Sequence, residues 1–291
     1  MSDRLVRLAR QALASAQEVR RRGTRLILEP LCIYDLAADL GVDVWFQKIA
    51  SLEGMYARLS PPRIILGAER PAGRRAYTCA HELGHHVLGH GTRVDELREE
   101  GNRRYEFEPE EYQAQVFAGM LLMPKLAVVS AFSERGWKPS TASAEQLYRI
   151  ANLFGVGFES IVRHMQLTLG ILPRERAEAL DNVKLREIRA SLVGLEQAAY
   201  QVVVVDPFWH GRPVDLEVGD RLLAPGGVRC DGENLRYMNL SDAGSLWEPI
   251  FPGRCRLYLT NGSWGVFVRV SRRGFEGRSQ FRHQPEVTEN D

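Results

Sequence analysis

Four of the seven histidines of this chain fall within the segment HELGHHVLGH, at positions 81–90. His81 and His85 are four residues apart, and this spacing on a helix places two side chains on one face, one turn apart. Two imidazoles in that arrangement can bind one zinc ion. Glu82 is rotated to the side, where its carboxylate can reach a water activated by the metal. Zinc lowers the pKa of such a water to about 7, so the pattern predicts hydrolysis of a carbonyl substrate with Glu82 as general base.

A catalytic zinc site needs a third protein ligand and an open position. A third histidine ten residues after His81 is excluded, because that position is Gly91. A carboxylate from the later segment PEEYQAQVFAGMLLMP is the remaining common solution. Glu111 lies on the apolar face of that predicted helix, and Glu110, one step around it, is the alternative. The facing favours Glu111 as the third ligand.

The other histidines of the segment have different expected roles. His86 lies about 100° around the helix from His85 and cannot share the metal with the same geometry. His90, near the helix end, could contact the ligands from outside the site or suit the helix dipole. An oxyanion donor has two candidates from the sequence, Tyr105 and His90.

The elements around this segment follow from hydrophobic periodicity. The short runs VDVWFQKI, GMYARLS and RIILG are rich in β-formers and are separated by Ser, Gly and Pro, which predicts a small sheet before the HELGH helix. Two helical patterns flank a turn at Gly155–Gly157, as in a helix-turn-helix. Period-two patterns dominate again after residue 200. The fold class expected is α+β, with a small C-terminal β-rich domain.

These patterns divide the chain into five expected units. A metallopeptidase-like domain spans 1–128, a helix-turn-helix-like segment 129–172 and a connector helix 173–200. The β-rich domain spans 201–272, and the polar stretch 273–291 is expected to be a disordered tail.

Composition excludes several classes of protein. The charged fraction is 26% and the net charge is +1, so binding to nucleic acid through phosphates is not implied. No apolar run approaches the ~18 residues needed to cross a bilayer, and none is expected to enter a membrane. The four cysteines are scattered without a CxxC pair, which favours a reducing, cytoplasmic compartment.

Two segments could contact macromolecules. GMYARLS is a candidate edge strand that would pair with an extended substrate, and a core-facing strand is the equal alternative. FESIVRHMQLTLG would be the recognition helix of a DNA-binding motif, but it carries one arginine and one histidine among apolar and uncharged residues. This composition favours packing or protein docking, and direct DNA binding is not expected.

Four separated blocks resemble, in order, segments of the ImmA/IrrE metallopeptidases. They are EPLCIYDLAADLGVDV, GMYARLSPPRIILGAERPAGRRAYTCAHELGHHVLGH, EEYQAQVFAGMLLMP and the helix-turn-helix-like part. The resemblance covers roughly residues 25–170 and implies a zincin-like minimal metallopeptidase domain in a cytoplasmic bacterial protein. It also implies zinc ligands His81, His85 and Glu111 with Glu82 as base. The family's Glu-x-x-Ala-Asn has Gln115 at the asparagine position, which alters a contact behind the ligand.

The best-understood members of that family cut helix-turn-helix transcriptional repressors in response to stress. The function expected from this resemblance is a zinc-dependent endopeptidase acting on a protein substrate, most plausibly such a repressor. A regulatory or antitoxin-like protein that binds its partner without cutting it is the first alternative. A DNA-binding transcriptional regulator is the second.

Overall fold

The computed structural model describes all residues except 1–2, 23–28, 97–107, 242 and 286–291. Tyr105, one candidate for the oxyanion donor, lies outside the described residues. The helices of the described part are α1 (Asp3–Arg22), α2 (Ile33–Asp39), α3 (Ala72–Val87), α4 (Pro109–Leu122), α5 (Lys125–Glu134), α6 (Ala144–Phe154), α7 (Phe158–Arg163), α8 (Arg174–Asp181) and α9 (Leu185–Val193).

One five-stranded sheet supports the helix that carries the histidines. Its strand order is β13-β1-β3-β2-β4. The strands are β1 (Asp43–Gln47), β2 (Leu52–Ala57), β3 (Arg63–Gly67), β4 (Arg93–Glu96) and β13 (Gly277–Arg278). The expected small sheet is therefore present, and its alternating burial reflects one face packed on the core.

Of the two alternatives for GMYARLS, the edge strand is wrong and the core-facing strand agrees with the structure. β4 pairs with the outer side of β2, with Tyr56 opposite Arg93 and Met55 opposite Val94. The charged stretch after Gly91 supplies this strand. β2 is an interior strand because both of its sides are hydrogen-bonded, to β3 and to β4.

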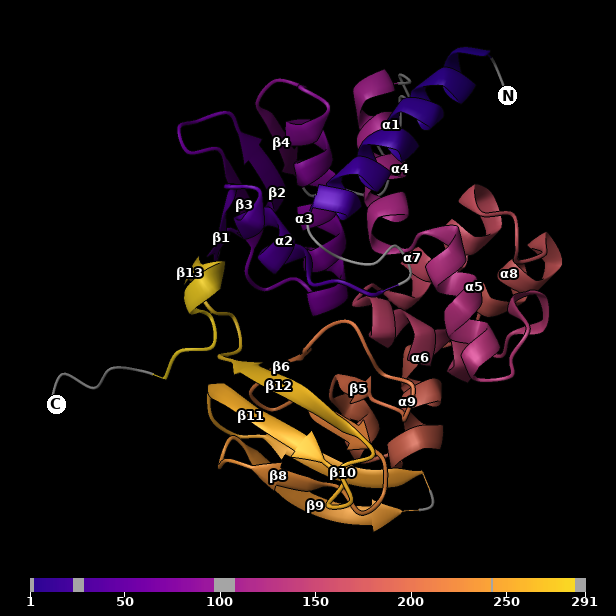
Figure 1. The fold of residues 1–291 in the computed structure, drawn as a ribbon, viewed down its shortest axis with the longest axis vertical. Helices are drawn as coiled ribbons and strands as arrows, with labels where there is room; N and C mark the ends of the chain where they lie inside the picture. Colours follow the sequence, from indigo (N-terminus) through magenta and orange to yellow (C-terminus); the bar gives the residue numbers. More distant parts are fainter. Residues whose placement is uncertain (1–2, 23–28, 97–107, 242, 286–291) are drawn as a thin grey trace, which may run out of the picture.

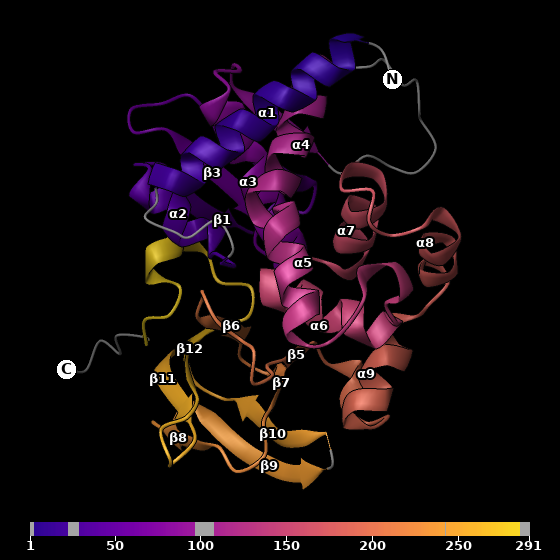
Figure 2. The ribbon, with the colours of Figure 1, turned by 45° about the vertical axis from the view of Figure 1, so that its right-hand side comes forward.

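The C-terminal part is a pair of four-stranded sheets, as the period-two pattern predicts. One has the order β5-β7-β10-β9 and the other β6-β12-β11-β8. The strands are β5 (Val202–Val204), β6 (Val214–Glu217), β7 (Arg221–Ala224), β8 (Arg229–Asp231), β9 (Leu235–Ser241), β10 (Gly244–Pro249), β11 (Gly253–Tyr258) and β12 (Gly265–Ser271). These sheets lie on the opposite side of the molecule from α1 (Figures 1 and 2).

The tail expected to be disordered is ordered over residues 273–285. β13 pairs antiparallel with β1, with Trp45 opposite Arg278 and Phe46 opposite Gly277. A short 3-10 helix follows, after which Arg282 and His283 are 6% and 4% exposed. In both views the C-terminal segment returns to the N-terminal part of the fold (Figures 1 and 2). A composition-based prediction fails here because backbone pairing to β1 needs no apolar side chains.

One hydrophobic core runs through the described residues, from Ala12 to Val270. The helix-turn-helix-like pair α6 and α7 contributes to it through both helices, with Ile150 and Ile161 fully buried. The predicted unit boundaries along the chain stay predictions.

The stretch Pro109–Glu134 has an 18-residue window with mean hydropathy 1.7, long and apolar enough to cross a membrane by length and composition. The sequence expectation that no such window exists is therefore wrong for this stretch. It consists of α4 and α5, and 56% of the window is buried inside the protein. Burial on this scale is typical of core helices, and Arg20 of α1 donates to the carbonyl of Leu121 within it.

Candidate metal centre

α3 presents two imidazoles to the same point. His81 and His85 are one turn apart, and their Nε2 atoms lie 3.1 Å from each other. His85 is fully buried, whereas the side chain of His81 is 13% exposed. The spacing in the sequence therefore places both imidazoles on one face of α3, as predicted.

A close crossing of α3 and α4 supplies the third group. A Cβ atom added at Gly84 would lie 3.0 Å from the Phe117 ring and 3.1 Å from the Ala114 Cα, so only glycine allows this approach without adjustment. Ala114 is one turn beyond Glu111 on α4. Because the two helices touch at Gly84 and Ala114, Glu111 is held beside the histidines.

The carboxylate of Glu111 contacts both imidazoles. One oxygen is 3.1 Å from the Nε2 of His81 and the other is 3.5 Å from the Nε2 of His85. Hydrogen bonds from the two histidines lower the pKa of Glu111 below its usual range, so the group is a carboxylate. Among the described residues, His81, His85 and Glu111 form the group that could hold a metal ion, and Glu110 is not part of it.

The dimensions of this group suit zinc. Ligand atoms about 2.0–2.1 Å from a tetrahedral ion are about 3.3 Å from one another. Here the two Nε2 atoms are 3.1 Å apart, and one oxygen of Glu111 lies 3.1 Å from His81 while the other lies 3.5 Å from His85. Two nitrogens and one oxygen also match the donor set of catalytic zinc sites, which leave a fourth position open. The residues present therefore fit a tetrahedral ion.

His90 orients one of these imidazoles from behind. Its Nδ1 lies 2.9 Å from the Nδ1 of His85, and its backbone N–H donates to the His85 carbonyl. This contact engages the far nitrogen of His85 and leaves Nε2 directed at the site. His90 therefore contacts a candidate ligand from outside the site, which is one of the roles predicted for it. Its position does not support a role as oxyanion donor.

The remaining residues of the motif have structural partners. The hydroxyl of Tyr56 on β2 is 2.9 Å from the Nδ1 of His86, which joins the sheet to α3 on the side away from the metal group. Glu82 is fully buried beneath the same strand. A Cβ atom at Gly54 would lie 2.8 Å from an Oε1 oxygen of Glu82. β2 thus confines the carboxylate that the sequence predicts to be the base.

A cavity of about 910 Å³ opens beside the metal group. His81 and Glu111 line one part of it, and residues of the C-terminal half line another. The candidate metal centre therefore opens onto a space that residues of both halves of the chain line.

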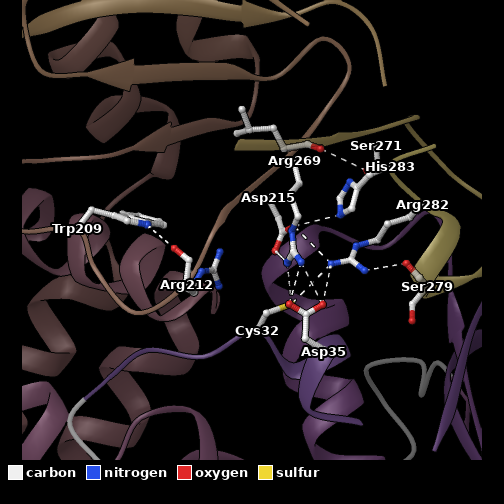
Figure 3. Close-up of polar contacts among 11 residues, drawn as sticks. Cys32, Asp35, Trp209, Arg212, Asp215, Arg269, Ser271, Ser279, Arg282 and His283 are labelled. Atoms are coloured by element: carbon white, nitrogen blue, oxygen red, sulfur yellow. Dashed lines mark hydrogen bonds and ion pairs between the residues drawn. The ribbon is translucent and has the colours of Figure 1, made fainter. Parts of the chain in front are cut away.

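A buried polar cluster joins the two halves and was not predicted. Arg269 of β12 donates to Asp35 of α2 and to Asp215 of β6, at 2.8–3.1 Å. Arg282 is 3.4 Å from Asp215, and its guanidinium also reaches Cys32 at the start of α2 (Figure 3). No local pattern could reveal this cluster, because its members come from segments about 180 to 250 residues apart in the chain.

Electrostatics in this cluster favours the ionised forms. Burial alone would raise the pKa of Asp215, but Arg282, His283 and Arg269 outweigh it and hold that pKa well below its usual range. The Nε2 of His283 lies 3.3 Å from the same carboxylate. Arg282 and His283 also line the cavity beside the metal group, so this buried polar cluster forms part of the cavity wall.

Comparison with protein families now bears on this geometry. Residues 37–166 match the family model described as IrrE N-terminal-like domain. This part of the chain is similar to that domain. The match begins in α2 and contains the HELGH helix, Glu111 and the α6–α7 pair. Over these residues the chain is similar to peptidases of the ImmA/IrrE type. No curated protein matches the chain.

Proposed function

We propose that this IrrE-like protein is a zinc-dependent endopeptidase with His81, His85 and Glu111 as ligands. The observation that carries the proposal is the convergence of their side chains on one point. The Nε2 atoms of His81 and His85 are 3.1 Å apart, and the two oxygens of Glu111 lie 3.1 Å from the first and 3.5 Å from the second. These separations are close to those between the ligands of a tetrahedral zinc ion. The peptidase family of the same segment supports the reaction class.

The proposed chemistry divides among the side chains of α3. A bound zinc ion would polarise the scissile carbonyl and make a water more acidic. Glu82 accepts a proton from the attacking water and returns it to the leaving amine. Its burial beneath β2 restricts its rotamers and keeps bulk water away from it. His90 holds the His85 ring in one orientation.

The proposed substrate is a helix-turn-helix transcriptional repressor, cut in the cytoplasm during a stress response or the regulation of a mobile element. The support is the activity of the best-understood members of the family. The free state of all four cysteines is consistent with that compartment.

The test is the variant Glu82→Gln, co-expressed with the product of the neighbouring gene as the candidate repressor. We expect one zinc ion per chain and an unchanged melting temperature, because Glu82 is not a ligand. Cleavage, followed on a gel and by mass spectrometry, is expected to fall below detection. The matched control is Glu110→Gln, which lies outside the ligand group and should cut normally.

Two results would contradict the proposal. Continued cleavage by Glu82→Gln would remove Glu82 from the mechanism. A wild-type protein that holds the repressor without cutting it would favour the binding-protein alternative instead.

A further inference from the structure

The cavity beside the metal group extends along α3 toward the C-terminal half. Its wall includes His81 in the middle of α3 and Gly73 near the start of that helix. The backbone of Gly157 packs directly against Gly73. Since each helical residue advances about 1.5 Å, this contact lies about 12 Å along the helix axis from His81.

Arg212 stands at this far end of the cavity. Its guanidinium lies over Gly155, where an added Cβ atom would meet the Nη1 nitrogen. It stacks on Trp209, with Cζ 5.5 Å from the ring centroid. Trp209 in turn donates its Nε1–H to the Arg212 carbonyl at 3.0 Å (Figure 3). This hydrogen bond fixes the backbone of Arg212 beside the ring on which its side chain stacks. The side chain is thus held in one place by packing.

The guanidinium of Arg212 lacks a counter-charge within the described part of the chain. It forms no ion pair with a described carboxylate, and its Nε is buried without a hydrogen-bond partner there. Arg189 on α9 lines the same cavity and has neutral partners only. Its Nη2 donates to Gln201 at 2.7 Å and its Nε to the hydroxyl of Tyr148 at 3.4 Å.

Other arginines of the cavity wall are neutralised by the protein itself. Arg74 pairs with Glu53 at 2.7 Å, and Arg75 pairs with Glu217. Arg282 is paired with Asp215 in the buried polar cluster. Two guanidinium groups that face one cavity without a partner carboxylate can bind a ligand that supplies the negative charge.

We propose that Arg212, assisted by Arg189, forms a subsite for an acidic side chain of the polypeptide substrate. The inference rests on the proposed endopeptidase function. An extended chain advances about 3.3 Å per residue, so the length of about 12 Å along α3 corresponds to about four residues from the scissile bond. Arginine suits this role because its planar fork binds a carboxylate through two parallel hydrogen bonds.

The first experiment uses the zinc-loaded full chain and a library of dodecapeptides, with cleavage sites read by mass spectrometry. We expect Asp or Glu to be enriched at one position, about four residues from the cleaved bond. In Arg212→Gln, kcat/KM for a Glu-containing peptide should fall tenfold or more, since a charge-assisted hydrogen bond is lost. The peptide with Gln at that position should change less than twofold. Arg174→Gln, which removes an exposed arginine of α8, is the matched control.

Charge reversal provides a result that a structural role alone would not produce. Arg212→Glu should disfavour acidic peptides and enrich Lys or Arg at the same position. If either Arg212 variant melts well below the wild type, Arg189→Gln is measured in its place and should weaken the acidic preference in part. An acidic preference that survives in all of these variants would overturn the subsite.

Binding separates the subsite from the proposed reaction. Fluorescein-labelled Glu and Gln peptides of one sequence are titrated against Glu82→Gln protein, with anisotropy as the readout. A preference for the Glu peptide that disappears with Arg212→Gln supports the subsite. If the wild type shows this preference but cuts no peptide, only the proposed function fails. Cleavage without any acidic preference overturns the subsite alone. If the protein neither cuts nor binds the peptides, both the subsite and the proposed function are overturned.

Discussion

His85 illustrates how neighbouring side chains prepare a single residue. It is fully buried, and both ring nitrogens are engaged, Nδ1 by His90 and Nε2 by the ligand group. A buried imidazole has few rotamers, and a fixed partner on one nitrogen selects the tautomer that exposes the other. The candidate ligand is therefore oriented before any metal binds.

The change His90→Ala tests this orientation. It removes the group behind His85, and we expect zinc affinity to fall about tenfold to a hundredfold. Competition with a chromophoric chelator measures the affinity. His86→Ala is the control, because His86 contacts Tyr56 and not a ligand. Equal zinc affinities for the two variants would show that His90 does not act through His85.

At the scale of elements, the α6–α7 pair serves as packing. The capping box of Ser143 and Gln146 starts α6, and Gly155, in the left-handed region with φ 67°, ends it. The π-helical turn His164–Thr168 continues α7. His164, 5% exposed, bonds through Nε2 to the carbonyl of Met123 at the end of α4. The pair is thereby connected to the helix that carries Glu111.

The burial of His164 predicts a pH dependence of stability. Burial lowers the pKa of His164 from 6.5 to about 4, because the folded protein disfavours its charged form. The unfolded chain then binds more protons between those values, so stability is complete above pH 6.5 and is lost as pH falls toward 4. The loss amounts to about 3 kcal/mol over this range.

Chemical denaturation at pH 7, 6, 5 and 4 measures this loss. The variant His164→Gln should show a shallower dependence on pH than the wild type. His210→Gln, at an exposed histidine, should leave the dependence unchanged. Parallel curves for the wild type and His164→Gln would contradict the assignment.

At the scale of the whole molecule, the two halves are joined by charge as well as by the core. Asp215 faces three cationic or polar groups, Arg269, Arg282 and His283, and Arg269 also reaches Asp35 across the interface. A buried network of this kind is costly to break because the remaining charges keep no partner.

Asp215→Ala should lower the free energy of unfolding by about 3–5 kcal/mol, since Arg282 remains buried without its main counter-charge. Urea denaturation at neutral pH provides the measurement. Glu178→Ala, in an exposed pair on α8, is the control and should leave the free energy essentially unchanged. A small effect at Asp215 would mean that solvent replaces the carboxylate.

The sequence by itself determined the local part of the candidate site. The spacing of His81 and His85 and the apolar face that selects Glu111 are consequences of helical periodicity, which acts over four residues. The strands before α3 follow from period-two patterns for the same reason. Nothing in these patterns depends on distant parts of the chain, and the structure has both features where they are expected.

Only the tertiary structure decided the rest. The edge position of β4, the return of β13 to β1 and the cluster around Asp215 join segments that no local period connects. The place of Arg212 beside Gly155 belongs to the same class. Such contacts depend on how whole elements pack. Polar segments such as 273–285 acquire order from backbone pairing and ion pairs, and these interactions leave no hydrophobic pattern in the sequence.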